Sequence, residues 1–89
     1  MKLTWTEPAA DDLEELVDYI GRDKPDAAAR VAQRIVHRLE SLSSFPLTGR
    51  KGEVQGTYEV VLTPHPYVAV YRVFDNEMRI MRIRHSAQA

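Results

Sequence analysis

Hydrophobic residues in the first half of the chain follow a helical period after one short stretch of alternation. Leu3 and Trp5 alternate with polar neighbours, which predicts a short first strand. The sequence Thr6-Glu7-Pro8 is typical of a helix start, and Gly21 is typical of a helix end. Between them the hydrophobic residues lie at helical spacing, as one face of a helix requires: Leu13, Leu16, Val17 and Ile20.

A second helix is predicted to begin at Asp23-Lys24-Pro25 and to end before Ser43-Ser44-Phe45-Pro46. Because the connection between the two helices is short, they are expected to form an antiparallel hairpin. The apolar positions of the second helix recur in steps of four and three, with two valines widening the stripe: Ala28, Ala32, Ile35, Leu39 and Leu42, and then Val31 and Val36.

From residue 46 onward the pattern changes to that of strands. Residues 46–56 contain Pro46 and three of the four glycines, which predicts a loop. Strands are predicted at 58–62, 67–74 and 78–84, with a rigid corner at Pro64-His65-Pro66 and a tight turn at 75–77. The expected fold is one α+β domain over residues 1–89, in the order β-α-α-β-β-β, with the helical hairpin packed on one face of a small, mostly antiparallel sheet.

Composition excludes several classes of function. A chain of 89 residues is too short to enclose a deep substrate cavity, and no complete catalytic set is visible. The absence of cysteine excludes disulfides, thiolate metal sites and cysteine catalysis. No phosphate-binding, zinc or calcium motif is present, so no metal and no cofactor is expected. No signal peptide or membrane span is recognisable, which predicts a cytoplasmic protein without membrane contact.

Charge is unevenly distributed along the chain. Residues 1–45 carry six basic and nine acidic side chains, whereas residues 46–89 carry six basic and four acidic ones. The net charge of −1 is far from the basic balance of proteins that grip nucleic acid by its phosphates. Two interpretations stay open: ordinary solvated charge, or an acidic back with a basic working face.

The arginines of the second half are the main candidates for binding. Strict alternation along the last strand places Arg82 and Arg84 on one face, and Arg79 with His85 on the other. Because the helices must cover one of these faces, some guanidinium groups are expected to bond inward. The exposed ones can meet phosphates or acidic side chains of a partner. The full set is Arg50, Arg72, Arg79, Arg82 and Arg84.

Other polar groups allow a structural or a functional interpretation. His37 is expected at the surface, and His65 lies in the proline corner. His85 ends the last strand, either bonded to backbone or available to a ligand. The acidic run from Asp11 to Asp18 is either the solvated side of the first helix or a docking stripe for a basic partner segment.

Short motifs recur in order along almost the whole chain, and together they resemble the RelE/ParE superfamily of bacterial toxins from type II toxin–antitoxin pairs. The motifs are Ala10-x-Asp12-Leu13 with Tyr19-Ile20, Pro25-x-Ala27-Ala28, Leu42-x-x-x-Pro46-x-x-Gly49-Arg50, Gly56-Thr57-Tyr58-Glu59, Pro66-Tyr67-Val68-x-x-Tyr71-Arg72-Val73 and Ile80-x-Arg82-Ile83-x-His85.

The resemblance implies a toxin neutralised by a cognate antitoxin in a hetero-oligomer. RelE-like members cut messenger RNA, mostly on the ribosome, whereas ParE-like members act on DNA gyrase. The cutting members carry a basic or acid–base group on the third strand, where this chain has Val68. A valine cannot move a proton or stabilise a phosphorane, so the ParE-like branch is favoured. Tyr58 departs from this branch, because an arginine often stands at that position.

Two alternatives to a gyrase inhibitor stay open: a ribosome-dependent mRNA endoribonuclease, and a degenerate toxin that only binds its antitoxin and helps it to repress their operon. An endoribonuclease would use Arg50, Arg72, Arg82 and His85. Target binding is predicted at Arg50, Tyr58, Arg79, Arg84 and His85. Antitoxin binding is predicted at Leu16, Tyr19, Val31 and Val36, because this stripe is wider than one sheet face can cover.

Overall fold

The chain begins with strand β1 (Lys2–Trp5) and passes directly into helix α1 (Glu7–Gly21). Thr6 makes this change of direction possible, because its hydroxyl oxygen accepts a hydrogen bond from the Ala9 N–H at 3.2 Å. The same hydroxyl lies 3.1 Å from the carbonyl oxygen of Ile80 and 3.0 Å from that of Met81. The predicted cap is therefore confirmed, and it also ties the helix start to the last strand.

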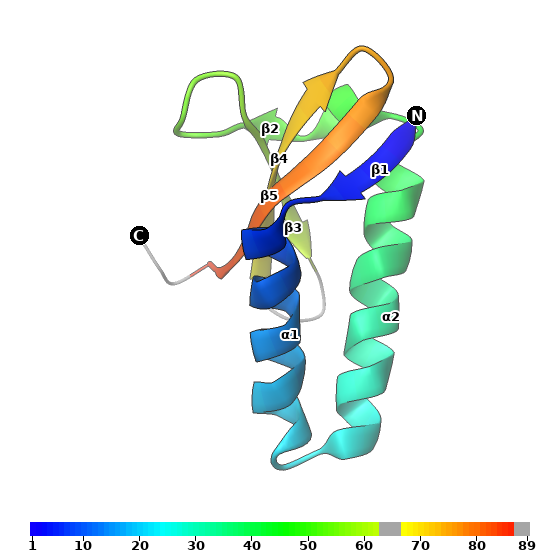
Figure 1. The fold of residues 1–89 in the computed structure, drawn as a ribbon, viewed down its shortest axis with the longest axis vertical. Helices are drawn as coiled ribbons and strands as arrows, with labels where there is room; N and C mark the ends of the chain where they lie inside the picture. The colour runs from blue at the N-terminus through cyan, green and yellow to red at the C-terminus, as the bar shows by residue number, and fades with distance from the viewer. Residues whose placement is uncertain (63–66, 87–89) are drawn as a thin grey trace.

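Helix α2 (Pro25–Leu42) runs back beside α1, as predicted for a hairpin (Figure 1). Its N-cap is Lys24, whose side chain makes no capping hydrogen bond. The predicted loop after it is more ordered than expected, since it contains a 3-10 turn, η1 (Pro46–Thr48), and a short strand, β2 (Arg50–Lys51). The sheet therefore has five strands instead of the four that were predicted.

The remaining strands are β3 (Tyr58–Leu62), β4 (Tyr67–Phe74) and β5 (Glu77–His85). They form one sheet in the order β1-β5-β4-β3-β2, in which β1 runs parallel to β5 and every other pair is antiparallel. The α+β class and the mostly antiparallel sheet are thus confirmed. These statements concern residues 1–62 and 67–86, which the structure, a computed structural model, describes; the predicted corner Pro64-His65-Pro66 lies outside them.

A β-bulge in β5 changes the direction of its side chains. Tyr71 pairs with Ile80 but the preceding Val70 pairs with Arg82, so Met81 is an extra residue. The prediction that Arg79 and His85 share a face is therefore wrong. Beyond the bulge, Ile83 continues the buried series that Met78 and Ile80 begin.

The core lies between the helices and one face of the sheet. It contains Ala9, Leu16, Val31, Ile35, Leu39, Leu42, Val60, Leu62, Ala69, Tyr71, Met78, Ile80 and Ile83. Two residues predicted to be exposed for an antitoxin are thus core residues, because Leu16 is 6% exposed and Val31 is 5% exposed. Val36 is half-buried, and only Tyr19 of that predicted set is largely exposed, at 68%. Leu16 and Val31 both pack in the core that the helices and the sheet enclose together, so less of the stripe is left exposed than was predicted.

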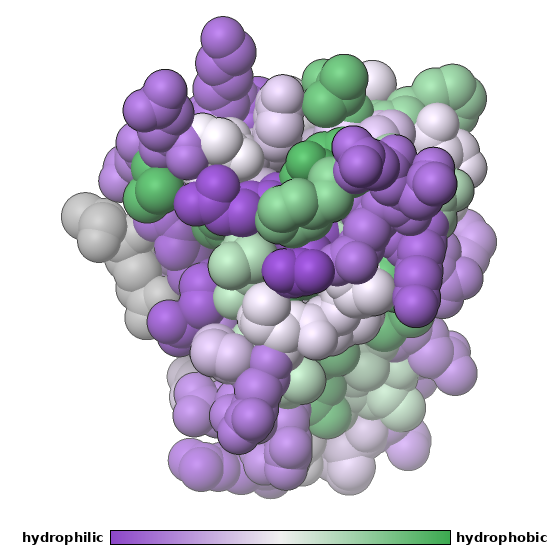
Figure 2. All heavy atoms as spheres, turned by 45° about the horizontal axis from the view of Figure 1, so that its top comes forward, coloured by the Kyte–Doolittle hydropathy of each residue, from purple (hydrophilic) through white to green (hydrophobic). Residues whose placement is uncertain are grey.

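Figure 2 shows the end of the molecule opposite the helical turn, where polar side chains predominate and apolar ones form several separate patches. Exposed apolar residues in the described chain include Phe45, Leu47 and Val54. No helix in the described residues is long and apolar enough to cross a bilayer.

Candidate binding surfaces

The face of the sheet turned away from the helices, here called the open face, carries a cluster of Arg50, Glu59 and Arg84. Arg50 donates to Oε1 of Glu59 from Nε at 3.3 Å and from Nη2 at 3.1 Å. Arg84 donates from Nη2 to Oε2 of the same carboxylate at 2.9 Å. Both carboxylate oxygens of Glu59 are therefore engaged by arginines from two different strands.

The sheet register explains why these three residues meet. Arg50 of β2 stands directly opposite Glu59 of β3, and Glu59 stands opposite Val70 of β4. Arg84 of β5 is opposite Val68, one step away on the same face, so its long side chain crosses β4 diagonally. The Glu59 side chain is 7% exposed, whereas Arg50 is 65% exposed and Arg84 is 28% exposed. The arginines thus cover a buried carboxylate.

Two more arginines lie on the open face, but nearer the opposite end of β5. Arg79 donates to Glu77 at 2.6 Å and stacks over the ring of Phe74, 4.6 Å from its centroid. Hydrogen bonds from Arg79 and Thr4 lower the pKa of Glu77. Arg72 approaches the carbonyl oxygen of Gln55 at 3.5 Å, beside the β2–β3 loop. Of the predicted target-binding residues, Arg79 is therefore separate from Arg50 and Arg84.

Tyr58 and His85 point to the other face. Tyr58 is therefore apart from the arginine cluster, whereas His85 and Arg84 both line a groove between α1 and β5. Tyr58 stacks on the core residue Tyr71 with ring centroids 5.7 Å apart. His85 packs edge-on against Tyr67 with ring centroids 5.3 Å apart. The residues predicted for an endoribonuclease are also divided between the two faces, because His85 lies on the helix side and Arg72 lies on the open face.

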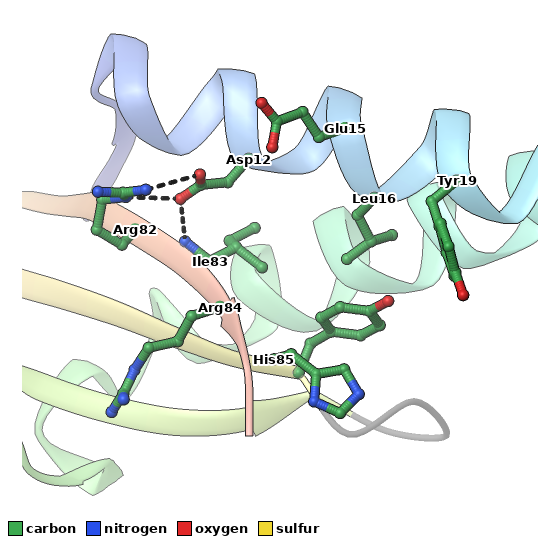
Figure 3. A pocket seen from close by; sticks show the side chains of 9 residues that line it. Asp12, Glu15, Leu16, Tyr19, Arg82, Ile83, Arg84 and His85 are labelled. Carbon is green, nitrogen blue, oxygen red and sulfur yellow. Dashed lines mark hydrogen bonds and ion pairs between the residues drawn. The ribbon is translucent and has the colours of Figure 1, made fainter. Parts of the chain in front are cut away.

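A groove runs between α1 and the end of β5, and Figure 3 shows the side chains on its two walls. Helix α1 contributes Asp12, Glu15, Leu16 and Tyr19, and the sheet contributes Tyr67, Arg82, Ile83, Arg84 and His85. The volume of the groove is about 590 Å³. It exists because β1 ends at Trp5, which pairs with Ile80, so the rest of β5 has α1 beside it instead of a strand.

Asp12 lies at one end of this groove and accepts hydrogen bonds from two residues of β5. Its Oδ2 accepts from Nε of Arg82 at 2.7 Å and from the backbone N–H of Ile83 at 2.9 Å, and its Oδ1 accepts from Nη2 of Arg82 at 3.0 Å. Burial alone would raise the pKa of Asp12, but these hydrogen bonds and the arginine charge outweigh it, so the pKa lies below its ordinary value. Asp12 therefore anchors α1 to the exposed edge of the sheet.

Arg82 and Arg84 leave the strand in different directions, as Figure 3 shows: Arg82 turns toward Asp12, and Arg84 points away from α1. Arg84 thus borders both the groove and the open face. Asp12 was predicted only as part of an acidic run, either solvated or a docking stripe, and Glu59 was not predicted as a member of any surface. The available signal for Glu59 was a carboxylate in an otherwise apolar strand, Tyr58–Leu62.

Comparison with known proteins places this architecture in a family. Residues 3–89 match the family model described as the ParE toxin of type II toxin–antitoxin system, parDE. The chain belongs to this ParE toxin family. Among curated relatives, Toxin RelE2 of Caulobacter vibrioides is 40% identical over 87 residues, which cover 98% of this chain and 97% of that protein. The family membership predicted from the sequence motifs is thus confirmed.

Solved structures of other proteins have the same fold. The chromosomal ParDE toxin–antitoxin system from P. aeruginosa contains a chain that matches with a TM-score of 0.86 and 33% identity, over 96% of this chain and 95% of that one. A chain of the intact E. coli RelBE toxin–antitoxin complex matches with a TM-score of 0.73 and 15% identity, over 98% of each chain. This second likeness concerns the fold alone.

Proposed function

We propose that this toxin inhibits DNA gyrase by binding it through the open face, without cutting a substrate. The observation that carries the proposal is the chemistry of that face. Its centre is Val68 and Val70, and its charged cluster pairs two arginines with a carboxylate that is already engaged. Arginine holds carboxylates and phosphates by two-pronged hydrogen bonds, which suits binding more than proton transfer.

The arrangement of His85 supports binding over cleavage. General acid–base catalysis needs a titratable group within hydrogen-bond reach of the reacting atoms. His85 lies on the helix side against Tyr67, whereas Arg50 and Arg72 lie on the open face. A substrate phosphate on the open face would thus meet arginines but not the histidine. Because one relative is named RelE2, an endoribonuclease is the rival function that the test must address.

The proposed partner for neutralisation is a cognate antitoxin that occupies the α1–β5 groove. The groove combines the exposed ring of Tyr19 with charged groups on both walls, Glu15 on α1 and Arg82 on β5. An amphipathic or extended segment can place an apolar side chain beside Tyr19 and bond the charged rims. Such a pair would act in the cytoplasm as a hetero-oligomer.

The test is to add the purified toxin to gyrase and to follow DNA supercoiling, with ribosome-bound messenger RNA as a parallel substrate. We expect loss of supercoiling at rising toxin concentration, recovery when the antitoxin is added, and intact transcripts. Cleavage of transcripts with normal supercoiling would instead identify an endoribonuclease. Antitoxin binding without either effect would identify a co-repressor that has lost its toxicity.

A further inference from the structure

We infer that Glu59 is a positioning residue, which fixes Arg50 and Arg84 on the open face so that together they receive an acidic group of the target protein. The inference rests on the proposed function, because it names the part of the open face that makes the contact. It assigns to a buried carboxylate a role in binding rather than in folding.

The sheet does not need a charge at position 59. The Glu59 side chain is 7% exposed, so its charge is largely removed from water. A buried ion pair is often no more stabilising than well-packed apolar side chains of similar volume. The neighbours on this face, Val61, Val68 and Val70, are apolar, and an apolar residue would continue their pattern.

The carboxylate of Glu59 holds arginine side chains from two strands in fixed positions. A free arginine has many rotamers, and each rotamer lost on binding weakens the complex. Glu59 holds one edge of the Arg50 guanidinium through Nε and Nη2, and it holds Arg84 through its other oxygen. Both arginines are thereby placed before the target arrives.

The exposed guanidinium of Arg50 indicates the chemistry of the partner. A guanidinium group has five N–H donors, so the two that Arg50 gives to Glu59 leave others, and 65% of the side chain is exposed. Among the described residues, Arg50 has no other hydrogen-bond partner than Glu59. The unused N–H donors of this exposed guanidinium complement a carboxylate. The chain as a whole carries −1, which favours an acidic protein surface over a nucleic acid.

The experiment compares Glu59→Gln with Glu40→Gln, a control that removes an exposed carboxylate on α2, outside both the open face and the groove. Each toxin is purified and assayed for gyrase inhibition and for antitoxin affinity. We expect Glu59→Gln to need at least 10-fold more toxin for half-inhibition, with antitoxin affinity and melting temperature near wild type. Glu40→Gln should stay within 2-fold of wild type in every assay.

A second pair of measurements separates positioning from stability. Glu59→Met keeps the volume and removes the charge, so it is expected to fold and to lose inhibition to the same degree. Arg50→Lys should weaken inhibition strongly in the wild-type background but little beside Glu59→Gln, because the arginine is then no longer held. Additive effects of the two substitutions, or full inhibition by folded Glu59→Met, would overturn the inference.

Growth arrest in cells makes the outcome independent of the proposed target. If wild-type toxin does not inhibit gyrase, the proposed function fails. The positioning role still holds in that case if Glu59→Gln abolishes arrest while Glu40→Gln keeps it. If the wild-type toxin cleaves messenger RNA and Glu59→Gln does not, the assignment of an acidic protein as partner is overturned.

Discussion

At the scale of single residues, a close approach between the backbone and a core side chain limits which residue can stand directly before β2. Gly49 is one such position, because a Cβ there would overlap the hydroxyl oxygen of Tyr71 and lie 2.9 Å from the backbone oxygen of Glu59. Tyr71 is fully buried and donates to the carbonyl oxygen of Pro46 at 2.6 Å. Burial raises the pKa of Tyr71. The glycine therefore allows the chain to enter β2 directly over a core tyrosine.

Gly49→Ala is expected to destabilise the protein by about 1–3 kcal/mol, as overpacking usually does. Part of this loss should be recovered in the Gly49→Ala/Tyr71→Phe double variant, because the hydroxyl group is the nearest obstacle. Urea unfolding of the two single variants and the double variant measures the coupling. Strictly additive free energies of unfolding would mean that the backbone at Glu59 is the obstacle instead.

Asp12→Asn is expected to destabilise the protein by about 1–3 kcal/mol at neutral pH, because it removes charge-assisted hydrogen bonds to Arg82 and Ile83. The folded-state pKa of Asp12 lies below its ordinary value of 3.8, so its stabilisation is present above that value and is lost as the pH falls through the folded-state pKa. Urea unfolding between pH 7 and pH 3 measures this. The stability difference between wild type and variant should shrink toward the acid end, and a difference that stays constant would contradict the assignment.

The pairing of Asp12 and Glu59 with arginines was not predicted, and the physical reason is the same for both. Asp12 and Glu59 act through partners that are 70 and 25 positions away from them, in Arg82 and Arg84. A helical or strand period places a side chain on a face, but it does not say which distant residue stands opposite. Asp12 belongs to an acidic run whose pattern fits a solvated helix side equally well. The sheet register decides the Glu59–Arg84 pair, and the packing of α1 beside β5 decides the Asp12–Arg82 pair.

At the scale of elements, the helices and the long strands could be predicted, whereas the irregular parts of the sheet could not. Both helices have a strong 3.6-residue period, and α1 has its caps in sequence, so their bounds were confirmed. Strand β2 has only two residues, too few for a period to show. The bulge at Met81 shifts the alternation by one position, so the predicted faces fail beyond it.

The α1 side of the groove offers a contrast between two residues one helical turn apart. Leu16→Ala should destabilise the protein by about 2–5 kcal/mol, because Leu16 is a core residue. Tyr19→Ala should leave the stability of the toxin nearly unchanged, since its ring is 68% exposed, but should weaken antitoxin binding about 10-fold, or about 1.4 kcal/mol. Calorimetric titration with the antitoxin, beside thermal unfolding of the free toxin, measures both effects. Unchanged affinity in Tyr19→Ala would place the antitoxin elsewhere.

At the scale of the whole molecule, the two proposed binding surfaces lie on opposite sides of β5 and meet at its end. The groove lies on the helix side, and the arginine cluster lies on the open face. Arg84 borders both, whereas Tyr19 borders only the groove and Arg50 only the open face. Neutralisation can then follow from a shared residue, without the antitoxin covering the whole target surface.

This arrangement predicts a crossed pattern for three variants in two assays, growth arrest and antitoxin affinity. Arg50→Ala should reduce growth arrest and keep antitoxin affinity, because it lies only in the open-face cluster. Tyr19→Ala should keep growth arrest and reduce antitoxin affinity. Arg84→Ala should reduce both, because it removes a wall of the groove and one of the two arginines on Glu59. If Arg84→Ala behaves like Arg50→Ala, the two surfaces are independent, and the antitoxin must block the target by its bulk rather than through the end of β5.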